Sequence, residues 1–282
     1  MPLLLLAALL VLYLQNGEAF LTPGSSGRRR LSNAHVHCRA NTRSRLYLGE
    51  GSIVDGDSIE GEEEELDVYG KLRNELKGTN LFLVGMMGSG KSAVGDAIGR
   101  KMGYRYIDTD EVAEYMIEMP IADFFAKDGE QEFRQVEHKI LLELAQYTRT
   151  VISTGGGIVE FSENWGILHH GIIVFLDVSP EVIYERLSAN PEEIKKRPLL
   201  HGGDALEKLN EIRDKRLNLY NQADVKVTIS KDLSIEEVDE LVASTVLDTI
   251  KANPPQWMTW KANKEKEMRN NLFKDDADNV LQ

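Results

Sequence analysis

The sequence predicts an α/β fold in three layers, in which a five-stranded parallel sheet lies between helices. From residue 76 to about residue 230, short β-rich runs alternate with amphipathic stretches of helical length. This alternation is typical of a parallel sheet whose strands are joined by covering helices. The first run is followed directly by a glycine-rich turn that contains a lysine and a serine. Such a turn between a strand and a helix indicates a phosphate-binding site.

Several runs have the composition of strands, and others have helical periodicity. The strand-like runs are expected to be buried on both faces, as in parallel sheets. The expected strands are residues 80–84, 105–108, 150–154, 172–177 and 225–229. The expected helices are residues 92–102, 132–146, 180–189, 206–223 and 234–251. Together these elements define one folded domain over residues 76–252.

The first 48 residues have the composition of a targeting sequence. Residues 1–19 combine an apolar run with small residues near their end, which predicts a signal peptide; an uncleaved membrane anchor is the alternative. Residues 20–48 carry six arginines, several serines and no acidic residue, as transit peptides do. This order resembles the bipartite presequence of algae with secondary plastids. We therefore expect a plastid (chloroplast) location.

The remaining flanking segments are charged. Residues 49–75 begin with an acidic run that holds few apolar groups, so we expect a solvated linker. Residues 253–282 are expected to be a charged C-terminal extension. The formal net charge of -13 argues against a non-specific nucleic-acid binder, which would need surplus Lys and Arg. The only cysteine, Cys38, lies in the expected presequence, so no disulfide or thiolate metal site is expected after cleavage.

The glycine-rich turn fits the pattern G-x-x-x-x-G-K-[ST], the phosphate-binding loop. Its glycines let backbone N–H groups converge on phosphate oxygens at the start of a helix. Lys91 would neutralise the β and γ phosphates of a nucleotide, and the Ser92 hydroxyl would bind Mg²⁺. The residues expected to bind ATP here are Gly85, Met86, Met87, Gly88, Ser89, Gly90, Lys91, Ser92 and Ala93.

Two aspartates follow the second expected strand. Parallel topology places Asp108 and Asp110 at the carboxyl edge of the sheet, beside the glycine-rich loop. Asp108 is then positioned to act on Mg²⁺, directly or through water, and Asp110 to orient an acceptor hydroxyl and take its proton. The alternative is structural, because aspartates commonly cap helices and occupy their first turn.

Arginines and glycines farther along the chain also suit a ligand. The planar fork of Arg134 matches a carboxylate, and Glu137, on the same helical face, can hold that fork, although such pairs are often ordinary surface pairs. Gly155, Gly156 and Gly157 leave backbone open to a ligand or make a tight turn. Arg197 lies in a cationic segment at about residues 190–205, which is expected to be a mobile lid or a solvated loop.

Three motifs in this order resemble those of shikimate kinases. They are Asp128-Gly129-Glu130-Gln131-Glu132-Phe133-Arg134-Gln135-Val136-Glu137, Thr154-Gly155-Gly156-Gly157 and Arg197-Pro198-Leu199-Leu200. The resemblance runs from about residue 81 to residue 229. It implies a P-loop NTPase-type fold similar to that of the nucleoside monophosphate kinases, and Mg-ATP-dependent phosphorylation of the 3-hydroxyl of shikimate in the pathway to chorismate and the aromatic amino acids.

The resemblance also assigns roles to residues. It implies that Arg134 and Arg216 bind the shikimate carboxylate, that the backbone of Gly155, Gly156 and Gly157 faces the substrate hydroxyls and the γ phosphate, and that Arg186 stacks on adenine. Arg197 would reach the transferring phosphoryl group from the lid. We expect a monomer whose partners are ATP and shikimate, without nucleic acid or membrane in the mature form.

Two other functions are compatible with these motifs. One is a non-catalytic shikimate-kinase-like protein that binds a nucleotide, against which the retained Lys91, Ser92, Asp108 and Asp110 argue. The other is a kinase of a different small polyol acid. The position of Arg134 and Arg216 relative to a single carboxylate distinguishes that enzyme from a shikimate kinase.

Overall fold

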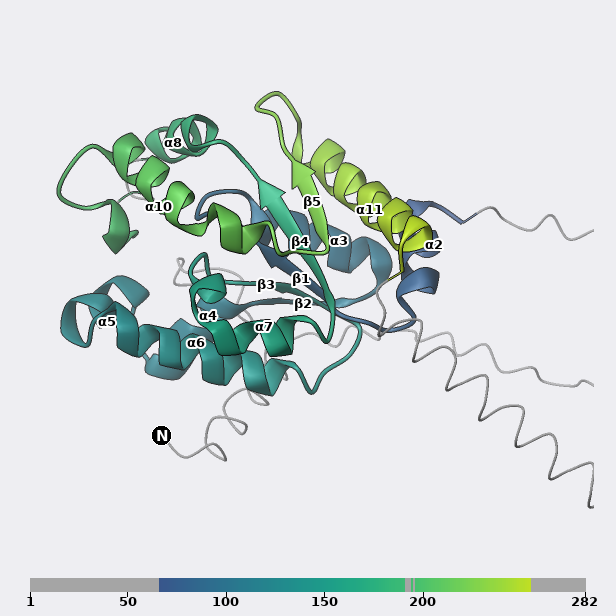
Figure 1. Ribbon diagram of the computed structural model, residues 1–282, viewed down its shortest axis with the longest axis horizontal. Helices are drawn as coiled ribbons and strands as arrows, with labels where there is room; N and C mark the ends of the chain where they lie inside the picture. The colour runs from purple at the N-terminus through teal and green to yellow at the C-terminus, as the bar shows by residue number, and fades with distance from the viewer. Residues whose placement is uncertain (1–65, 191–193, 195, 255–282) are drawn as a thin grey trace, which may run out of the picture. The chain divides into compact units, whose positions relative to one another are not determined.

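The structure is a computed structural model that describes residues 66–190, 194 and 196–254 (Figure 1). The expected signal peptide and transit segment lie outside the described residues. So do residues 49–65 of the expected linker and all but the first two residues of the C-terminal extension. Within the described part, no helix is long and apolar enough to cross a membrane.

The strands form one parallel sheet in the order β2-β3-β1-β4-β5. The expected strands are confirmed, with ends that differ by at most one residue. Their bounds are β1 (Leu81–Val84), β2 (Arg105–Asp108), β3 (Thr150–Ser153), β4 (Ile172–Asp177) and β5 (Val225–Thr228). The expectation that all five strands are buried is wrong for the two edge strands. Lys226 and Thr228 of β5 and Arg105 of β2 are exposed, because an edge strand has a neighbour on one side only.

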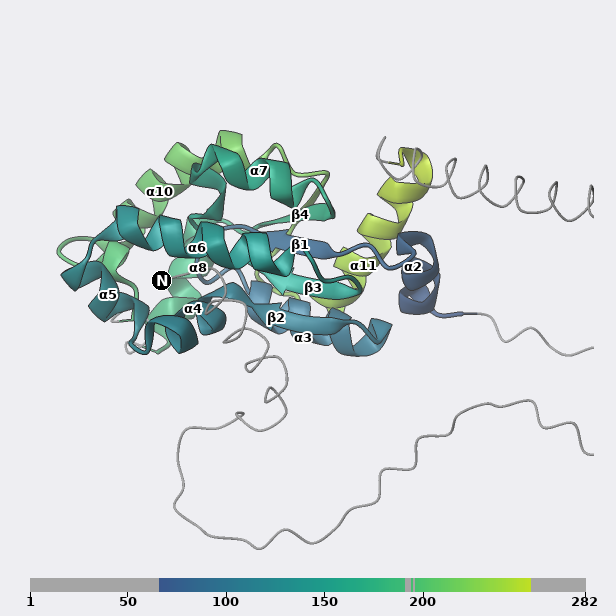
Figure 2. The same cartoon turned by 90° about the horizontal axis from the view of Figure 1, so that it is seen from below.

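Helices cover both faces of the sheet, as expected for a three-layer fold (Figures 1 and 2). Helices α3 (Lys91–Met102) and α11 (Ile235–Ala252) lie on one face, and α6 (Glu130–Leu144) and α7 (Ser162–Leu168) lie on the other. Helices α8 (Pro180–Ser188) and α10 (Ala205–Tyr220) pack on each other, and the arrowhead of β4 in Figure 1 points toward α8.

Several short elements were not expected from the sequence. They are α4 (Thr109–Ile117), α5 (Ile121–Lys127), α7, and the 3₁₀ helices η1 (Ile158–Glu160) and η2 (Pro198–Leu200). Helix α5 is seven residues long, and its apolar residues Ile121, Phe124 and Phe125 are only partly buried, so its pattern is too short to stand out in the sequence. The others span one to three turns, too few for periodicity to show.

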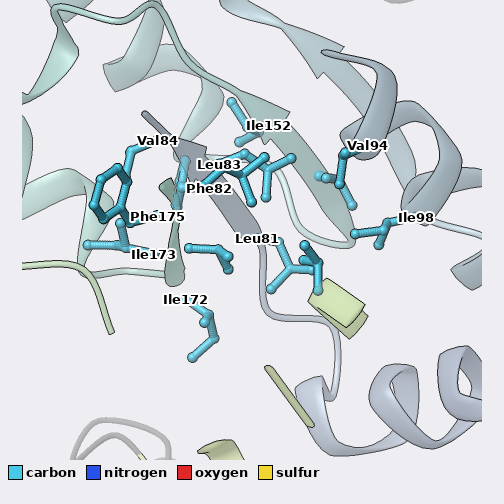
Figure 3. Packing of buried hydrophobic residues seen from close by; sticks show 14 of the residues in the cluster. Leu81, Phe82, Leu83, Val84, Val94, Ile98, Ile152, Ile172, Ile173 and Phe175 are labelled. Carbon is cyan, nitrogen blue, oxygen red and sulfur yellow. The ribbon is translucent and has the colours of Figure 1, made fainter. Parts of the chain in front are cut away.

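The central strands anchor the core (Figure 3). All residues of β1 and β4 are buried. Val94 and Ile98 of α3 lie on the side of β1 that carries Leu81 and Leu83. On the other face, the ring of Phe175 in β4 stacks on Tyr220 of α10, with ring centroids 4.9 Å apart. This packing fixes the ends of β1 and β4 beside α3 and α10, where the glycine-rich loop begins.

A helix occupies the end of the expected acidic linker. Helix α2 (Val68–Leu76) is capped by Asp67, whose carboxylate accepts a hydrogen bond from Gly70 N at 2.7 Å. It buries Tyr69, Leu72 and Leu76 in the core and packs on α11. The expectation of a linker through residue 75 is therefore wrong from residue 68 onward. The apolar residues repeat at helical spacing there, but they follow an acidic run that dominates the composition.

A buried carboxylate holds α2 against its neighbours. Asp239 of α11 is 1% exposed and accepts hydrogen bonds from Lys101 Nζ of α3 at 2.8 and 3.0 Å, and from the Tyr69 hydroxyl. Lys101 Nζ also lies 4.8 Å from the centre of the Tyr69 ring. The hydrogen bonds that Lys101 donates to Asp239 raise the pKa of Lys101. Three helices are thus joined at one charged group.

Replacement of Asp239 by asparagine is expected to destabilise the fold. The neutral amide loses the charge-assisted bonds to Lys101, so the free energy of unfolding should fall by about 1–3 kcal/mol. Urea denaturation followed by circular dichroism measures this change. Asp248→Asn, at an exposed position of the same helix, is the control. Equal effects of the two substitutions would show that Asp239 has no special role.

Candidate active site

A cavity of about 590 Å³ opens at the carboxyl edge of the sheet. Its wall combines the glycine-rich loop with residues that follow β2 and β3 and with parts of α6, η2 and α10. Many of the residues expected from the sequence line it: Met87, Gly88, Gly90, Lys91, Ser92, Ala93, Asp108, Asp110, Arg134, Gly155, Gly156, Gly157, Arg197 and Arg216. Gly85, Met86 and Ser89 belong to the same loop but lie beneath its surface. The topology therefore brings the dispersed motifs to one place.

The glycine-rich loop is held from inside by its own lysine. Lys91 Nζ donates hydrogen bonds to the carbonyl oxygens of Gly85 at 3.0 Å and Met86 at 2.9 Å. Gly90 begins α3 with a φ of 93°, which favours glycine, and a Cβ on Gly85 would lie 2.8 Å from the Leu176 carbonyl oxygen. Burial lowers the pKa of Lys91, and Arg197 and Arg216 add to this effect, while Asp110 and Asp108 oppose it. An anionic ligand would stabilise this ammonium group.

The structure confirms the structural interpretation of Asp108, and the two oxygens of this carboxylate have different partners. Oδ1 accepts a hydrogen bond from Asp110 N at 2.9 Å and so caps α4. Oδ2 accepts hydrogen bonds from Ser92 Oγ at 2.6 Å and from the Tyr106 hydroxyl at 3.0 Å. Ser92 and Asp108 together offer the hard oxygen ligands that Mg²⁺ prefers. Among the described residues there is no cluster of three or more potential metal ligands, so a metal here would also need phosphate or water oxygens.

Asp110 stands in the first turn of α4 and is exposed to the cavity. Its Oδ1 lies 2.8 Å from the position that a Cβ would take on Gly155. Desolvation deep in the cleft raises the pKa of Asp110, and the carboxylates of Asp108 and Glu137 raise it further, while Lys91 lowers it. Water within the open cavity limits the size of this shift. A carboxyl group with a raised pKa next to a phosphate site is suited to accept a proton.

Arg134 is held by the carboxylates of its own helix. Its Nη1 donates a hydrogen bond to Glu137 Oε2 at 2.7 Å, and its Nη2 pairs with Glu130. Burial lowers the pKa of Arg134, but Glu137 and Glu130 outweigh this effect and raise it overall. Burial of Glu137 raises the pKa of that carboxyl, against the pull of Arg134 and Arg216. The Arg134–Glu137 pair expected from the sequence is thus buried in the site rather than solvated.

Two of the three consecutive glycines are required by what lies against them. A Cβ on Gly155 would collide with the Glu137 carboxylate, and a Cβ on Gly157 would collide with the Arg134 guanidinium. Arg216, itself 2% exposed, donates from Nη1 to the Gly156 carbonyl at 3.2 Å, and the Tyr220 hydroxyl donates to the same oxygen at 2.6 Å. The glycine segment therefore separates the two arginines while touching both.

The other two expected arginines stand at the rim. Arg197 is partly buried, lines the cavity and begins η2. Arg186, near the end of α8, is exposed and does not line the cavity; its Nη1 lies 3.9 Å from the position of a Cβ on Gly90. Arg186 is thus beside the start of α3, outside the cavity proper. The expected lid, about residues 190–205, includes residues outside the described part of the chain.

Some residues of the site were not expected from the sequence. Ile121 and Phe125 of α5 and Phe133 of α6 form an apolar wall of the cavity, with the Phe125 and Phe133 rings 5.2 Å apart. The aromatic residues in this stretch could have been noticed in the sequence. Their position at the cavity depends on helix α5, which the sequence did not predict. Glu160, at the end of η1, contacts both Arg134 and Arg216. Nothing in the sequence pattern distinguished it from a surface glutamate.

Comparisons with known proteins agree with this arrangement. The family model described as shikimate kinase matches residues 87–251. The chain is 41% identical to a shikimate kinase of Trichormus variabilis over 175 residues, which are 62% of this chain and 92% of that one. It is 45% identical to a shikimate kinase of Gloeobacter violaceus over 153 residues, 54% of this chain and 85% of that one.

A solved structure shares the fold. It is a shikimate kinase from Acinetobacter baumannii in complex with shikimate, with 30% identity and a TM-score of 0.57 over 64% of this chain and 98% of that one. The fold, the assembled cavity and a family match over more than half of the sequence agree with one another. The chain belongs to the shikimate kinase family.

Proposed function

We propose that the enzyme transfers the γ phosphate of ATP to the 3-hydroxyl of shikimate within this cavity, giving shikimate 3-phosphate and ADP. The observation that carries this proposal is the placement of two guanidinium groups at one end of the cavity. Arg134 and Arg216 both contact Glu160 and Glu130, although they come from different helices. Two neighbouring forks suit a single acceptor carboxylate, which favours shikimate over an acceptor without an acid group.

Asp110 is the proposed partner of the acceptor hydroxyl. The hydroxyl oxygen would form the new bond to the γ phosphorus as the bond from that phosphorus to the bridging oxygen breaks, and ADP would leave. Asp110 would orient the hydroxyl and take its proton, since its carboxylate faces the cavity beside Gly155. The alternative role as a first-turn helix acid does not require a position in the cavity.

Charge neutralisation is the proposed source of most of the rate enhancement. Lys91 is buried beneath the loop that would hold the phosphates, and Arg197 lines the opposite rim. Both would stabilise negative charge on the transferring phosphoryl group, and Arg197 would do so as the lid closes. Arg186, next to Gly90 outside the cavity, is proposed to lie against the adenine.

The proposed metal ligands are Ser92 and Asp108. Their oxygens already lie 2.6 Å apart, and both residues line the cavity next to the loop. Mg²⁺ bound there would neutralise charge on the β and γ phosphates. Tyr106, which donates to the same Asp108 oxygen, would keep that carboxylate in position.

A plastid location and the division of the chain are also proposals. The two relatives compared above by sequence, from Trichormus variabilis and Gloeobacter violaceus, are cyanobacterial, which agrees with a plastid origin. Residues 1–19 are proposed as the signal, residues 20–48 as the transit segment and residues 253–282 as the extension. We further propose that the mature enzyme is a monomer with no membrane or nucleic-acid partner.

The reaction is tested by coupled ADP release from the purified protein with Mg-ATP and shikimate. Quinate, gluconate and AMP serve as alternative acceptors. Shikimate-dependent turnover is expected, and Lys91→Ala should abolish it because the buried ammonium group is lost. Nucleotide binding without turnover of any acceptor would contradict the proposal and support a non-catalytic relative.

The role of Asp110 is tested by its replacement with asparagine. Turnover should fall by a factor of about 100 to 10,000, because the amide cannot take the proton. Nucleotide affinity, measured by isothermal titration calorimetry, should remain, since Asp110 faces the acceptor. The variant should be no less stable than the parent, because Asp108 and Glu137 repel the carboxylate that it removes. An equal loss of ATP affinity would contradict this role.

The pH dependence of kcat/KM for shikimate follows from the raised pKa of Asp110. Asp110 must be ionised to take the proton, so activity is lost as the pH falls through the raised pKa. The acid limb should therefore lie closer to neutrality than the value of about 4 for an ordinary aspartate. A profile that stays flat down to about pH 4.5 would show that the ionisation of Asp110 does not limit the reaction.

A further inference from the structure

Glu160 is a buried carboxylate for which the proposed reaction has no use. It is the last residue of η1, three positions after Gly157. Its side chain is 16% exposed, and Glu160 is not among the described residues that line the cavity. It therefore contacts the two arginines without belonging to the wall of the cavity.

The contacts of Glu160 reach two separate helices. Its Oε1 lies 2.6 Å from Lys215 Nζ and 3.3 Å from Arg216 Nε, both on α10. Its Oε2 accepts a hydrogen bond from Arg216 Nη2 at 3.4 Å and lies 3.7 Å from Arg134 Nε of α6. Lys215 and Arg216 keep the pKa of Glu160 below its usual value although burial opposes this. Glu160 is thus ionised and shared by the two guanidinium groups.

The other carboxylates near the arginines do not share them in this way. Glu137 bonds to Arg134 only, through the terminal Nη1. Glu130 reaches both arginines, but its side chain is 38% exposed and it lies 3.8 Å from Arg216. Glu160 is more deeply buried, and it is the one of the three that approaches both Nε atoms. Those Nε atoms have no hydrogen-bond partner among the described residues, and the Glu160 carboxylate lies 3.7 Å from Arg134 Nε and 3.3 Å from Arg216 Nε.

A guanidinium whose two terminal nitrogens both donate to protein acceptors has a fixed plane, and this applies to Arg134 and Arg216. Each terminal nitrogen carries two hydrogens, so the bonds to Glu130, Glu137, Gly156 and Glu160 leave further hydrogens for a ligand. An arginine that is already ordered loses less conformational freedom when it binds, so its affinity for the ligand is higher. A carboxylate that contacts both arginines would therefore order both side chains before a single anion binds to them.

We propose that Glu160 is a positioning residue that orients Arg134 and Arg216 toward one acceptor carboxylate and thereby sets the affinity for shikimate. This inference rests on the proposed function. The opposite possibility is that the Glu160 charge only repels the acceptor, in which case its removal would strengthen binding. The charge of Glu160 and the length of its side chain can be tested separately by two substitutions. Aspartate keeps the charge but is one methylene shorter, and glutamine keeps the length but loses the charge.

The test compares Glu160→Gln and Glu160→Asp with two matched controls. Glu163→Gln removes an exposed carboxylate from the same segment, where it bonds to Ser162. Lys215→Met removes the exposed partner of Glu160 without touching either arginine. Arg134→Lys shows the size of a direct loss, because lysine cannot form a two-point contact with a carboxylate. The readouts are kcat, the KM values for shikimate and ATP, calorimetric shikimate binding and the thermal midpoint.

Both Glu160 variants are expected to raise the KM and the dissociation constant for shikimate about tenfold, since two side chains must then be ordered on binding. The KM for ATP and kcat should stay within about twofold, as should every constant of the two controls. An unchanged or lowered shikimate KM in Glu160→Gln, with parent-like values in Glu160→Asp, would overturn the proposal. So would parallel losses in ATP affinity and thermal midpoint. Failure of the parent enzyme to use shikimate would instead refute the proposed function.

Discussion

The close approach of Gly155–Gly157 to the charged groups of α6 is the constraint on which the site depends. The Glu137 carboxylate and the Arg134 guanidinium occupy space that any side chain on Gly155 or Gly157 would need. Because β3 ends just before this segment, the sheet determines how near α6 can come. Backbone from β3, charged side chains from α6 and the Arg216 guanidinium of α10 are therefore in contact before a ligand is bound. The cavity is built by packing and does not depend on long, freely moving side chains.

Charge compensation follows from that packing. Buried guanidinium groups are costly unless carboxylates accompany them, and Glu130, Glu137 and Glu160 accompany Arg134 and Arg216 here. The same reasoning applies to Lys91, which is paired with loop carbonyls and faces Asp108 and Asp110 across the cavity. Lys91, Arg134 and Arg216 are thus accompanied by carboxylates or carbonyl oxygens in the folded protein. The carboxylates near the site stabilise the arrangement of the cations, although they reduce the net positive charge of the site.

The sheet was predictable because β1 and β4 are continuous apolar runs bounded by turns. The glycine-rich loop was predictable because its pattern of glycines, lysine and serine is typical of phosphate binding. The edge strands were predicted as well, but their exposure was not, since Lys226 and Thr228 of β5 and Arg105 of β2 are exposed. Asp108 shows that two interpretations of one residue need not compete, because its two oxygens serve the cap and the Ser92 contact separately. Glu160 could not be found from spacing. Its partners lie on helices α6 and α10, and only tertiary packing brings them to η1.

Helix α2 extends the folded unit beyond the elements that build the cavity. Leu72 and Leu76 are fully buried, and Tyr69 shares Asp239 with Lys101. Loss of residues 68–76 would therefore expose apolar surface on α11 and α3 and leave Asp239 without one of its donors. Helix α3 also carries Lys91 and Ser92 at its start, so a disturbance at the Lys101 end would act on the helix that supports the phosphate site. Among the described residues, the folded unit thus includes α2 as well as the elements from β1 onward, and Asp67 belongs to it as the helix cap.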